Sequence, residues 1–400
     1  MKQRLLWVLA FLMVPLAWAQ VPADHQWTMA GKDYANTRFS TLDQINTGNV
    51  GQLQVAFSFP TGLDRGHEAA PIVAEDTMYI VGPYPNPVFA LDLTKPGASL
   101  KWRLDPPAHP PSQGAACCDT VNRGAAYSQG RLFFNTLDNH TIALDAKTGA
   151  ELWRTRLGDI KLGESMTMAP LVVKDKVLVG NAGGEFGVRG WLSALDGDKD
   201  VLTGPTSKPH YESDRGIDLG VKSWPPQAWK IGGGTVWGFV SYDPELDLIY
   251  YGTGNPGPWN PEQRPGDNKW TSGVFARKPD TGEAVWFYQS SPHDLHDYDG
   301  INESILVDLD WRGERRKVLL RPERNGYVYV MDRATGEVLS ATPFVHVTTS
   351  LGVDLKTGRL TYNPAKQPRM RETIRSNCPA SPGAKDWQPA AWSPRTRLLY

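Results

Sequence analysis

Apolar residues in this chain occur in short runs bounded by turn-forming residues, and few stretches show the longer periodicity of an amphipathic helix. After a polar lead-in from Val21 to Asn49, the runs group into units of two to four short strands, each ending in a turn. The composition agrees, because 39 Gly, 32 Pro and 15 Trp are typical of short strands joined by turns. The pattern therefore predicts an all-β fold.

These units repeat along the chain, and the aspartate of each turn marks the period. The copies are Asp92 with Trp102, Asp145-Ala-Lys-Thr-Gly149 with Trp153, Asp196, Asp280-Thr-Gly282 with Trp286, and Asp332-Arg-Ala-Thr-Gly336. The aspartates are 53, 51, 84 and 52 positions apart, so three intervals share one period and the long one contains an insertion. In such a turn the carboxylate accepts from local N–H groups, Gly takes the positive-φ position, and the trailing Trp can pack on a neighbouring unit. Four-stranded units that bury their faces against neighbours favour a propeller over a solenoid.

The first residues indicate export. Met1 to Arg4 is basic, Leu5 to Leu16 is apolar, and Ala17-Trp18-Ala19 is a small-residue cleavage site. A membrane anchor needs roughly 18–20 apolar residues, and this run is shorter. We expect residues 1–19 to be a cleaved signal peptide, with no membrane span in the mature chain and a periplasmic location in a Gram-negative source. The net charge of −1 shows no excess of basic residues of the kind that indicates nucleic-acid binding.

Two of the three cysteines, Cys117 and Cys118, are adjacent. A disulfide usually joins Cα atoms about 4.4–6.8 Å apart, whereas neighbouring Cα atoms are about 3.8 Å apart. A bond here would close no loop and would therefore restrict the unfolded chain very little. A rigid surface that packs against a planar group is a better explanation for it. The dipeptide alone is equally compatible with two buried free thiols or with one half of a metal site.

The run Cys117-Cys-Asp-Thr-Val-Asn-Arg123-Gly124 resembles the vicinal-cysteine segment of the pyrroloquinoline quinone (PQQ)-dependent methanol and ethanol dehydrogenases. The resemblance implies a disulfide between Cys117 and Cys118 that packs on one face of the quinone, and it implies that Arg123 reaches a cofactor carboxylate. The aspartate turns are similar to the tryptophan-docking motifs of this family's eight-bladed quinoprotein β-propellers. We therefore expect residues 20–400 to form one PQQ-binding β-propeller domain.

The C-terminal stretch indicates an incomplete propeller. Residues 392–400 parallel residues 242–250, but the earlier copy continues to Gly254-Asn255 and this one stops inside its strand. The family's match to Cys378 pairs with a cysteine beyond residue 400. We expect a C-terminally truncated chain that holds roughly six of eight blades.

The candidate chemistry is richest in Pro292-His-Asp294-Leu-His296-Asp297-Tyr-Asp299-Gly. On an extended backbone Asp297 and Asp299 would point the same way and Tyr298 the opposite way, and two convergent carboxylates favour a cation. The stretch resembles the family segment whose aspartate is the proposed catalytic base, and Asp297 matches that residue. Asp299 stands where calcium-dependent relatives commonly have Ala and lanthanide-dependent relatives have a second Asp. His296 stands where relatives commonly have an aromatic residue such as Trp.

Further site residues follow from the same resemblance. The implied metal ligands are Glu185, Asn255, Asp297 and Asp299, and the implied cofactor-binding residues are Glu68, Cys117, Cys118, Arg123, Thr167, Gly183, Gly184, Thr235, Trp237, Arg324 and Asp386. Asp386 lies where an Asn often contacts the cofactor. Three negative ligands instead of two favour a lanthanide(III) ion, with Ca²⁺ as the alternative.

These residues predict an enzyme, a PQQ-dependent alcohol dehydrogenase of class EC 1.1.2.-, that oxidises a small primary alcohol to an aldehyde. The expected mechanism is hydride transfer to PQQ, with Asp297 as base, the metal as Lewis acid and a c-type cytochrome as electron acceptor. The resemblance also allows for a homodimer. The alternatives are a non-catalytic β-propeller scaffold and an inactive truncated remnant. A nicotinamide enzyme has no support, because no strand-turn-helix unit carries a phosphate-binding glycine fingerprint.

Overall fold

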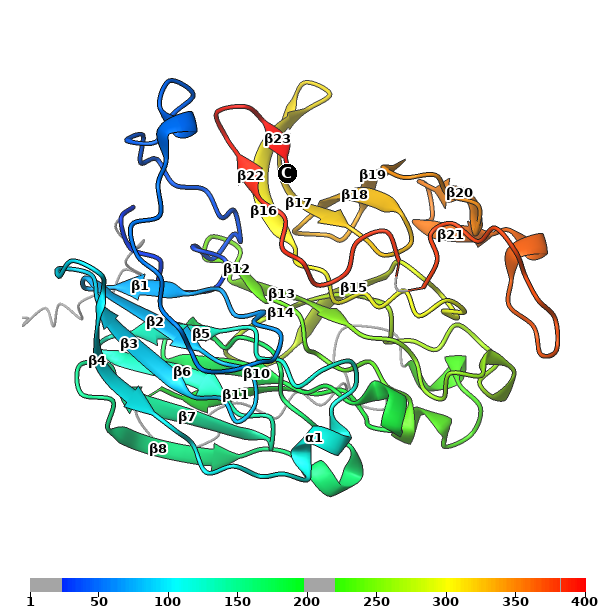
Figure 1. Ribbon diagram of the computed structural model, residues 1–400. Coiled ribbons are helices and arrows are strands. Elements are labelled where there is room, and N and C mark those ends of the chain that lie inside the picture. Colours follow the sequence, from blue (N-terminus) through cyan, green and yellow to red (C-terminus); the bar gives the residue numbers. More distant parts are fainter. Residues whose placement is uncertain (1–23, 198–219, 382) are drawn as a thin grey trace, which may run out of the picture.

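The computed structural model describes residues 24–197, 220–381 and 383–400, and these residues form mostly antiparallel β-structure (Figure 1). The expected signal peptide, residues 1–19, lies outside the described residues. Helices there are the one-turn α1 (Ser112–Ala115) and the 3-10 segments η1 (Val50–Gln52), η2 (Ile160–Leu162), η3 (Gly184–Phe186), η4 (Gly220–Ser223), η5 (Ala228–Ile231), η6 (Pro261–Gln263) and η7 (Pro364–Lys366). Within the described ranges, no helix is both long enough and apolar enough to pass through a bilayer. The all-β prediction is confirmed.

Four sheets have four strands each, joined in sequence order. The first contains β1 (Ile72–Ala74), β2 (Thr77–Val81), β3 (Val88–Asp92) and β4 (Ser99–Leu104), and the second contains β5 (Ala125–Ser128), β6 (Arg131–Asn135), β7 (His140–Asp145) and β8 (Glu151–Arg156). The other two contain β12 (Ser241–Asp243), β13 (Leu248–Thr253), β14 (Gly273–Arg277) and β15 (Ala284–Gln289), and β16 (Ile305–Trp311), β17 (Glu314–Pro322), β18 (Tyr327–Asp332) and β19 (Val338–Pro343). Each is the antiparallel meander expected of a propeller blade.

Three smaller sheets complete the described structure. A three-stranded sheet contains β9 (Leu171–Val173), β10 (Lys176–Gly180) and β11 (Leu192–Asp196), and two hairpins contain β20 (Ser350–Asp354) with β21 (Arg359–Tyr362) and β22 (Trp392–Ser393) with β23 (Leu398–Leu399). Residues 198–219, which follow β11 in the chain, lie outside the described ranges. The number of blades in a complete ring stays a prediction.

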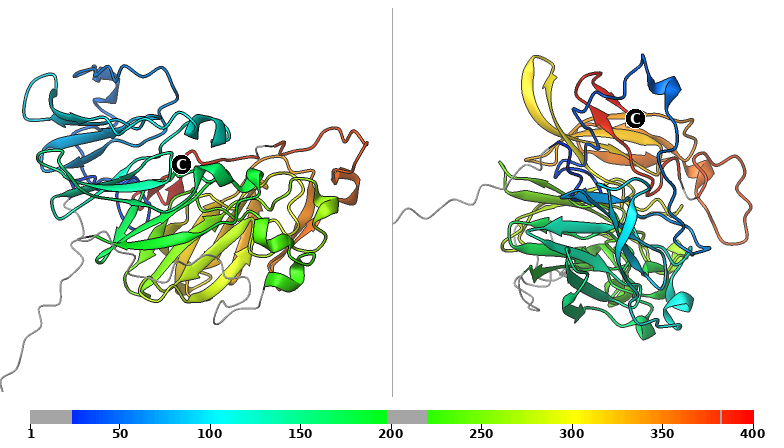
Figure 2. Two further views of the ribbon diagram at one scale, coloured as in Figure 1. Left: turned by 90° about the horizontal axis from the view of Figure 1, so that it is seen from below. Right: turned by 60° about the vertical axis from the view of Figure 1, so that its left-hand side comes forward.

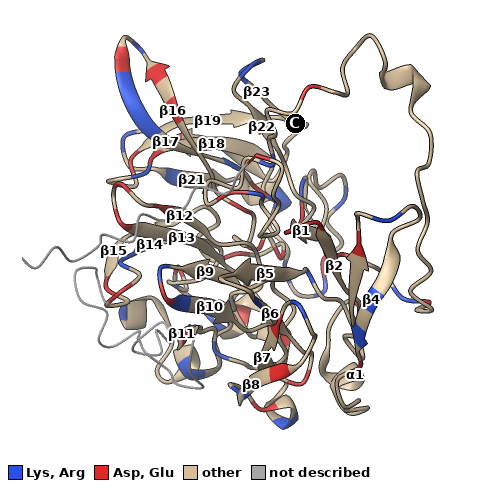
Figure 3. Ribbon diagram, turned by 90° about the vertical axis from the view of Figure 1, so that its left-hand side faces the viewer, with Lys and Arg blue, Asp and Glu red and all other residues tan. Residues whose placement is uncertain are grey.

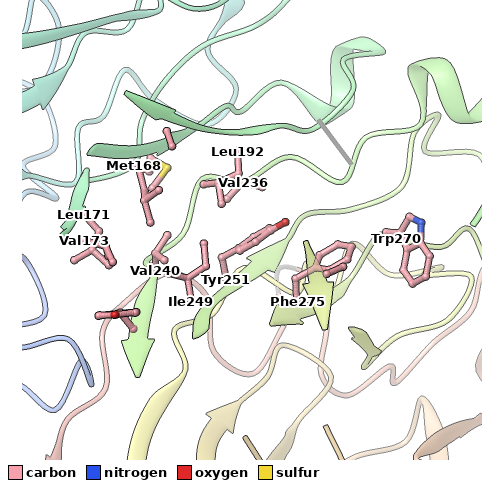
Figure 4. Close-up of a cluster of buried hydrophobic side chains, with 14 of the residues drawn as sticks. Met168, Leu171, Val173, Leu192, Val236, Val240, Ile249, Tyr251, Trp270 and Phe275 are labelled. Carbon is pink, nitrogen blue, oxygen red and sulfur yellow. The ribbon is translucent and has the colours of Figure 1, made fainter. Parts of the chain in front are cut away.

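Successive sheets bury both faces against their neighbours. Along β6, Leu132 and Phe134 pack with the first sheet, and Phe133 between them packs with the three-stranded sheet. This division follows from the two-residue period of a strand. Figure 4 shows the next such core, where residues of the β9–β11 sheet meet Tyr251 and Phe275 of the β12–β15 sheet. The β22–β23 hairpin packs beside the β16–β19 sheet, as the right-hand view in Figure 2 also shows.

The aspartate turns dock tryptophans from the preceding sheet, as predicted. In the turn after β7, Asp145 Oδ1 accepts from the Thr148 backbone N–H at 2.8 Å, and Gly149 has φ +76°. Trp102 of β4 donates through Nε1 to the Ala146 carbonyl of that turn at 3.1 Å. Trp286 of β15 likewise donates to the Arg333 carbonyl in the turn after β18.

Two details of these turns differ from the expectation. Asp280 forms ion pairs with Lys174 at 2.6 Å and Lys176 at 2.9 Å, so it links two sheets. A further turn of the same kind, unrecognised in the sequence, joins β20 to β21, where Asp354 accepts from the Lys356 N–H and Thr357 hydroxyl and Gly358 has φ +71°. Asp354 follows Asp332 by only 22 positions, so the turn chemistry recurs here outside the period of about 50 residues.

The segment Trp27–Arg38 passes along the first strands of most sheets. Its backbone hydrogen bonds reach Val73 in β1, Tyr127 in β5, Tyr242 in β12, Leu306 in β16 and Trp392 in β22. The Tyr34 hydroxyl adds a bond to the Val172 carbonyl in β9. A stretch expected only as a polar lead-in thus ties together the inner edges of six sheets.

Charged residues of both signs are interspersed over the molecule (Figure 3). On the long β16–β17 hairpin, for example, acidic Asp308 and Asp310 face basic Lys317 and Arg315 in the strand register. This mixing matches the net charge of −1.

Candidate active site

The predicted site residues lie on two kinds of loop. One kind enters the first strand of a sheet and carries Glu68, Arg123, Thr167, Thr235, Trp237, Asp297, Asp299 and Asp386. The other kind joins the second strand to the third and carries Gly183, Gly184, Glu185, Asn255 and Arg324. Because neighbouring strands run antiparallel, the entrance to strand one and the turn between strands two and three lie at the same end of a sheet. The fold thus collects these residues on one face.

Arg123 brings together four of the predicted cofactor-binding residues. Its guanidinium is buried and lies 3.0 Å from Glu68 Oε2, and its Nη1 donates to Thr167 Oγ1 at 2.8 Å. The same group lies over the Trp237 ring, 4.7 Å from the ring centre. Burial raises the pKa of Glu68, although nearby Arg123 opposes this shift. These four residues come from the loops before four different sheets, so only the tertiary structure joins them.

Cys117 and Cys118 form a disulfide in the structure, with Cα atoms 3.8 Å apart. The pair lies between α1 and β5, in the same loop as Arg123. Cys118 and Asp119 both have positive φ, at +65° and +97°, so the loop is sharply turned here. Backbone conformations of this kind are uncommon for residues other than Gly and often mark functional segments.

Arg324 is the centre of a second group, made of carboxylates. Its Nη2 lies 3.3 Å from Asp299 Oδ2 and also donates to Asp386 Oδ1. Its Nη1 donates to the Asp297 carbonyl at 3.0 Å and lies 3.9 Å from Asp297 Oδ2. Arg324 also lies over the Trp237 ring, 5.6 Å from its centre, so this indole joins the two arginine groups.

The convergence of Asp297 and Asp299 is present, but the predicted extended backbone is wrong. Asp297 has φ +65°, which is a left-handed conformation and not that of a strand. Tyr298 between them is buried, and its hydroxyl donates to the Pro379 carbonyl. A turn held by this buried tyrosine therefore directs both carboxylates toward Arg324.

Asn255 and the Gly183-Gly184-Glu185 loop lie beside Asp299. The Asn255 backbone N–H donates to Asp299 Oδ1, and its side-chain amide can donate to the same oxygen at 3.2 Å while accepting from Trp259 Nε1 at 3.3 Å. A β carbon at Gly184 would lie 3.1 Å from Asn255 Oδ1 and 3.4 Å from Thr235 Oγ1. The lack of a side chain at Gly184 therefore allows the loop of Glu185 to approach this centre closely.

The carboxylates hold more negative charge than their surroundings neutralise. Burial, followed by the charge of Asp294, raises the pKa of Asp297 to about 6, although Arg324 opposes this shift. Burial also raises the pKa of Asp299 well above its usual range. Arg324 lowers this pKa, whereas the negative charges of Asp297 and Glu185 raise it further. Asp297 Oδ1 is buried and has no hydrogen-bond partner. These features suit a multivalent cation, which would stabilise the ionised forms of Glu185, Asp297 and Asp299 at once.

The four predicted metal ligands do not form a closed cluster by themselves. Within the described ranges, no three His, Cys, Asp or Glu side chains are grouped closely enough to hold a metal ion. One predicted ligand is an asparagine, and Arg324 is the present counter-ion of Asp297 and Asp299. The types and the negative charge of these residues fit a cation. The distances between their side chains are those of carboxylates paired with Arg324.

A cavity of about 370 Å³ adjoins this centre. Its lining includes Asn255, Trp259, Arg264, the consecutive residues 294–297, Pro368, Asn377 and residues 379–381. His296 in this lining is 8% exposed, and its ring stacks on Tyr298 with centroids 4.9 Å apart. The imidazole of His296 therefore contributes a flat ring to the cavity wall.

Some residues of the site were not identified from the sequence. Trp387 lies under the Arg123 guanidinium, 5.5 Å from it, and Trp259 bonds to the amide of Asn255. Asp294 has a structural role, since its carboxylate accepts from the Ser272 hydroxyl and the His296 backbone N–H. Trp387 directly follows Asp386, and Trp259 is the last residue of the motif that contains Asn255. Both tryptophans could therefore have been identified from the sequence by their closeness to predicted site residues.

The docked antiparallel sheets, the adjacent disulfide and the arginine, tryptophan and carboxylate centre define a quinoprotein β-propeller. The family model described as "Glucose/ethanol/alcohol dehydrogenase, beta-propeller domain", named for PQQ, matches residues 27–351. The chain belongs to this family. The resemblance seen in the sequence is thereby confirmed.

Relatives and solved structures agree with this assignment. The lanthanide-dependent methanol dehydrogenase of Methylacidiphilum fumariolicum (strain SolV) is 50% identical over 390 residues, covering 94% of this chain and 64% of the relative. Subunit 1 of the methanol dehydrogenase (cytochrome c) of Methylorubrum extorquens is 44% identical, again covering 94% and 64%. A solved europium-containing methanol dehydrogenase superposes with a TM-score of 0.91 at 49% identity, covering 94% of this chain and 68% of that one. The chain thus spans slightly less than two thirds of the length of these two sequence relatives.

Proposed function

We propose that this chain is the cofactor-binding propeller of a PQQ-dependent alcohol dehydrogenase that oxidises a primary alcohol to an aldehyde. The observation that carries the proposal is that two buried arginines lie over the ring of Trp237, Arg123 at 4.7 Å and Arg324 at 5.6 Å from its centre. A flat indole with two cations beside it suits a planar cofactor that carries carboxylates. The family relationship supports the same reading.

The chain's residues would hold the two groups in adjacent parts of the site. Arg123, Thr167, Glu68 and Trp237, with the disulfide, would hold PQQ, and Glu185, Asn255, Asp297 and Asp299 would hold the metal ion. When bound, the quinone supplies a two-electron acceptor and the metal supplies Lewis acidity, neither of which a side chain offers.

Asp297 is the proposed base. Asp297 lines the cavity beside the carboxylate centre, and its Oδ1 is buried without a hydrogen-bond partner. This oxygen is therefore free to accept the proton of an alcohol hydroxyl. Its pKa of about 6 in the metal-free chain leaves it largely ionised at neutral pH. Arg324, which holds the Asp297 carbonyl and the Asp299 carboxylate, would fix the orientation of this base.

We further propose that the ion is a lanthanide(III), with Ca²⁺ as the alternative. Asp299 adds a third carboxylate to Glu185 and Asp297, and attraction to a cation grows with the product of the charges. The names of a lanthanide-dependent relative and of a europium-containing structure support the same choice. Export to the periplasm, transfer of electrons to a c-type cytochrome and a homodimeric state remain part of the proposal.

Reconstitution tests this function. The purified chain is incubated with PQQ and La³⁺ or Ca²⁺, and PQQ retention is measured by absorbance after gel filtration. Reduction of an artificial electron acceptor with a primary alcohol is then followed. Retained PQQ with alcohol-dependent reduction is the expected result, and retained PQQ without turnover of any alcohol would contradict the enzymatic proposal.

A further inference from the structure

The cavity next to Asp297 is lined by an unusual run of consecutive residues. Asp294, Leu295, His296 and Asp297 all contribute to its wall. In a strand, neighbouring side chains point to opposite sides. The positive φ of Asp297, +65°, breaks that alternation, so His296 and the proposed base contact the same space.

Three buried polar atoms on residues of this wall have no hydrogen-bond partner. They are Asp297 Oδ1, His296 Nε2 and Asn377 Oδ1. The other charged residues of the wall are bonded within the protein, since Asp294 accepts from Ser272 and His296, and Arg264 donates to Asn268 Oδ1 at 2.8 Å. Leaving a buried polar group unpaired costs about 1–3 kcal/mol, so His296 and Asn377 point to a ligand group that pairs with them.

The chemistry of the two atoms identifies that group. A neutral imidazole nitrogen either donates or accepts, depending on the tautomer, and an amide oxygen accepts. A hydroxyl group has one O–H donor and can also accept, so it can donate to Asn377 Oδ1 and accept from His296 Nε2 in the tautomer that carries the proton there. A carboxylate would meet the negative charges of Asp294 and Asp297, and a methyl group would leave both atoms unpaired.

We propose that His296 and Asn377 bind a second hydroxyl group of the substrate, so that the enzyme selects diols or other polyhydroxylated primary alcohols. The first hydroxyl lies at Asp297 and the second pairs with His296 and Asn377 in the wall of the same cavity. A volume of about 370 Å³ is in the range of small-molecule sites and greatly exceeds the roughly 30 Å³ that one water occupies in the liquid. This inference rests on the proposed alcohol dehydrogenase function for its reaction, but its binding part can be tested separately.

The binding test uses the purified chain without added cofactor. Saturation-transfer NMR titrations compare each diol from ethane-1,2-diol to pentane-1,5-diol with the 1-alkanol of equal heavy-atom number, in which a methyl replaces the second hydroxyl. We expect at least one diol to bind about tenfold more tightly than its partner, which corresponds to one satisfied buried pair. No preference at any length would overturn the proposal.

Two variants assign the preference. His296→Phe keeps a ring that can stack on Tyr298 but has no nitrogen, so the diol-to-alkanol ratio should fall to about one. The matched control is His346→Phe, because His346 is exposed and is not part of the cavity wall. An unchanged ratio in His296→Phe would also overturn the proposal.

The activity test then separates this inference from the proposed function. With PQQ and La³⁺ added, the ratio of kcat/KM for diol and matched alkanol should follow the binding ratio in both variants. If no alcohol is oxidised, the proposed function fails while the binding titrations still decide the role of His296. If both alcohols are oxidised with equal kcat/KM, the function stands and the diol selection is wrong.

Discussion

The guanidinium of Arg123 lies over the indole of Trp237, 4.7 Å from the ring centre, although the two residues are 114 positions apart in the chain. Arg324 lies over the same ring at 5.6 Å. This one indole therefore connects the group of predicted cofactor-binding residues around Arg123 with the carboxylates around Arg324.

The first prediction concerns this ring. Trp237→Leu removes a flat surface and two cation contacts, each worth about 0.5–2 kcal/mol, and should weaken PQQ binding by about tenfold or more. Trp237→Phe keeps an aromatic face and should lose less. Dissociation constants from a fluorescence titration with PQQ provide the measurement, and equal losses in the two variants would show that ring planarity is irrelevant.

The second prediction concerns the base. Asp297→Asn retains the shape of the side chain but can no longer accept the alcohol proton, so turnover should fall by about 10²–10⁴-fold. PQQ retention after gel filtration should remain within a few-fold of the parent chain. Turnover close to that of the parent would remove Asp297 from the chemical step, and loss of PQQ as well would assign it chiefly to metal binding.

The third prediction concerns metal choice. Asp299→Ala removes one of three carboxylates, so activation should shift from La³⁺ toward Ca²⁺, because the trivalent ion loses more attraction per charge removed. The measurement is titration of both metals into metal-free chain with PQQ present, using alcohol-dependent dye reduction. Asp310→Ala, on the exposed end of the β16–β17 hairpin, is the control. Identical metal preference in the parent and Asp299→Ala would show that Asp299 does not bind the ion.

The fourth prediction follows from the raised pKa of Asp297. The folded value is about 6 and the unfolded value is 3.8, so the folded state binds this proton more tightly. Protonation of Asp297 therefore adds to the free energy of unfolding below pH 4, by at most about 3 kcal/mol. This stabilisation is lost as the pH rises through 6. The metal-free parent should therefore lose more unfolding free energy between pH 4 and pH 7 than Asp297→Asn does. Denaturant titrations at the two pH values measure this difference, and parallel losses would show that Asp297 is not buried as a charge.

The fifth prediction concerns the adjacent disulfide. It closes no loop, so Cys117→Ser with Cys118→Ser should change the free energy of unfolding by less than about 1 kcal/mol. PQQ binding should nevertheless weaken by several-fold, because a rigid wall is lost. In the parent chain, mass spectrometry without reduction should find only Cys378 alkylated. Two further alkylated thiols would contradict the bond.

Much of the fold could be predicted from the sequence because it depends on local chemistry. The turn from Asp145 to Gly149 needs a carboxylate close to its N–H groups and a residue that tolerates positive φ, and both are visible in five consecutive residues. The alternation of Leu132, Phe133 and Phe134 reflects the two-residue period of a strand. Such features recur with each unit, so a repeat of strands and turns can be recognised without coordinates.

The residue types of the candidate site were also visible in the sequence, through motifs such as Cys117-Cys118 and Asp297-Tyr-Asp299. Their mutual placement was not, because Glu68, Arg123, Thr167 and Trp237 enter from four loops that only the packing of the sheets brings together. The backbone at Asp297 was wrongly expected to be extended, since the buried bond from Tyr298 to Pro379 fixes it from a distance of 81 residues. The unpaired atoms of His296 and Asn377 are likewise a property of the packed cavity. Local sequence sets which turns and strands form, whereas burial and long-range contacts decide which charges face each other and which polar atoms remain free for a ligand.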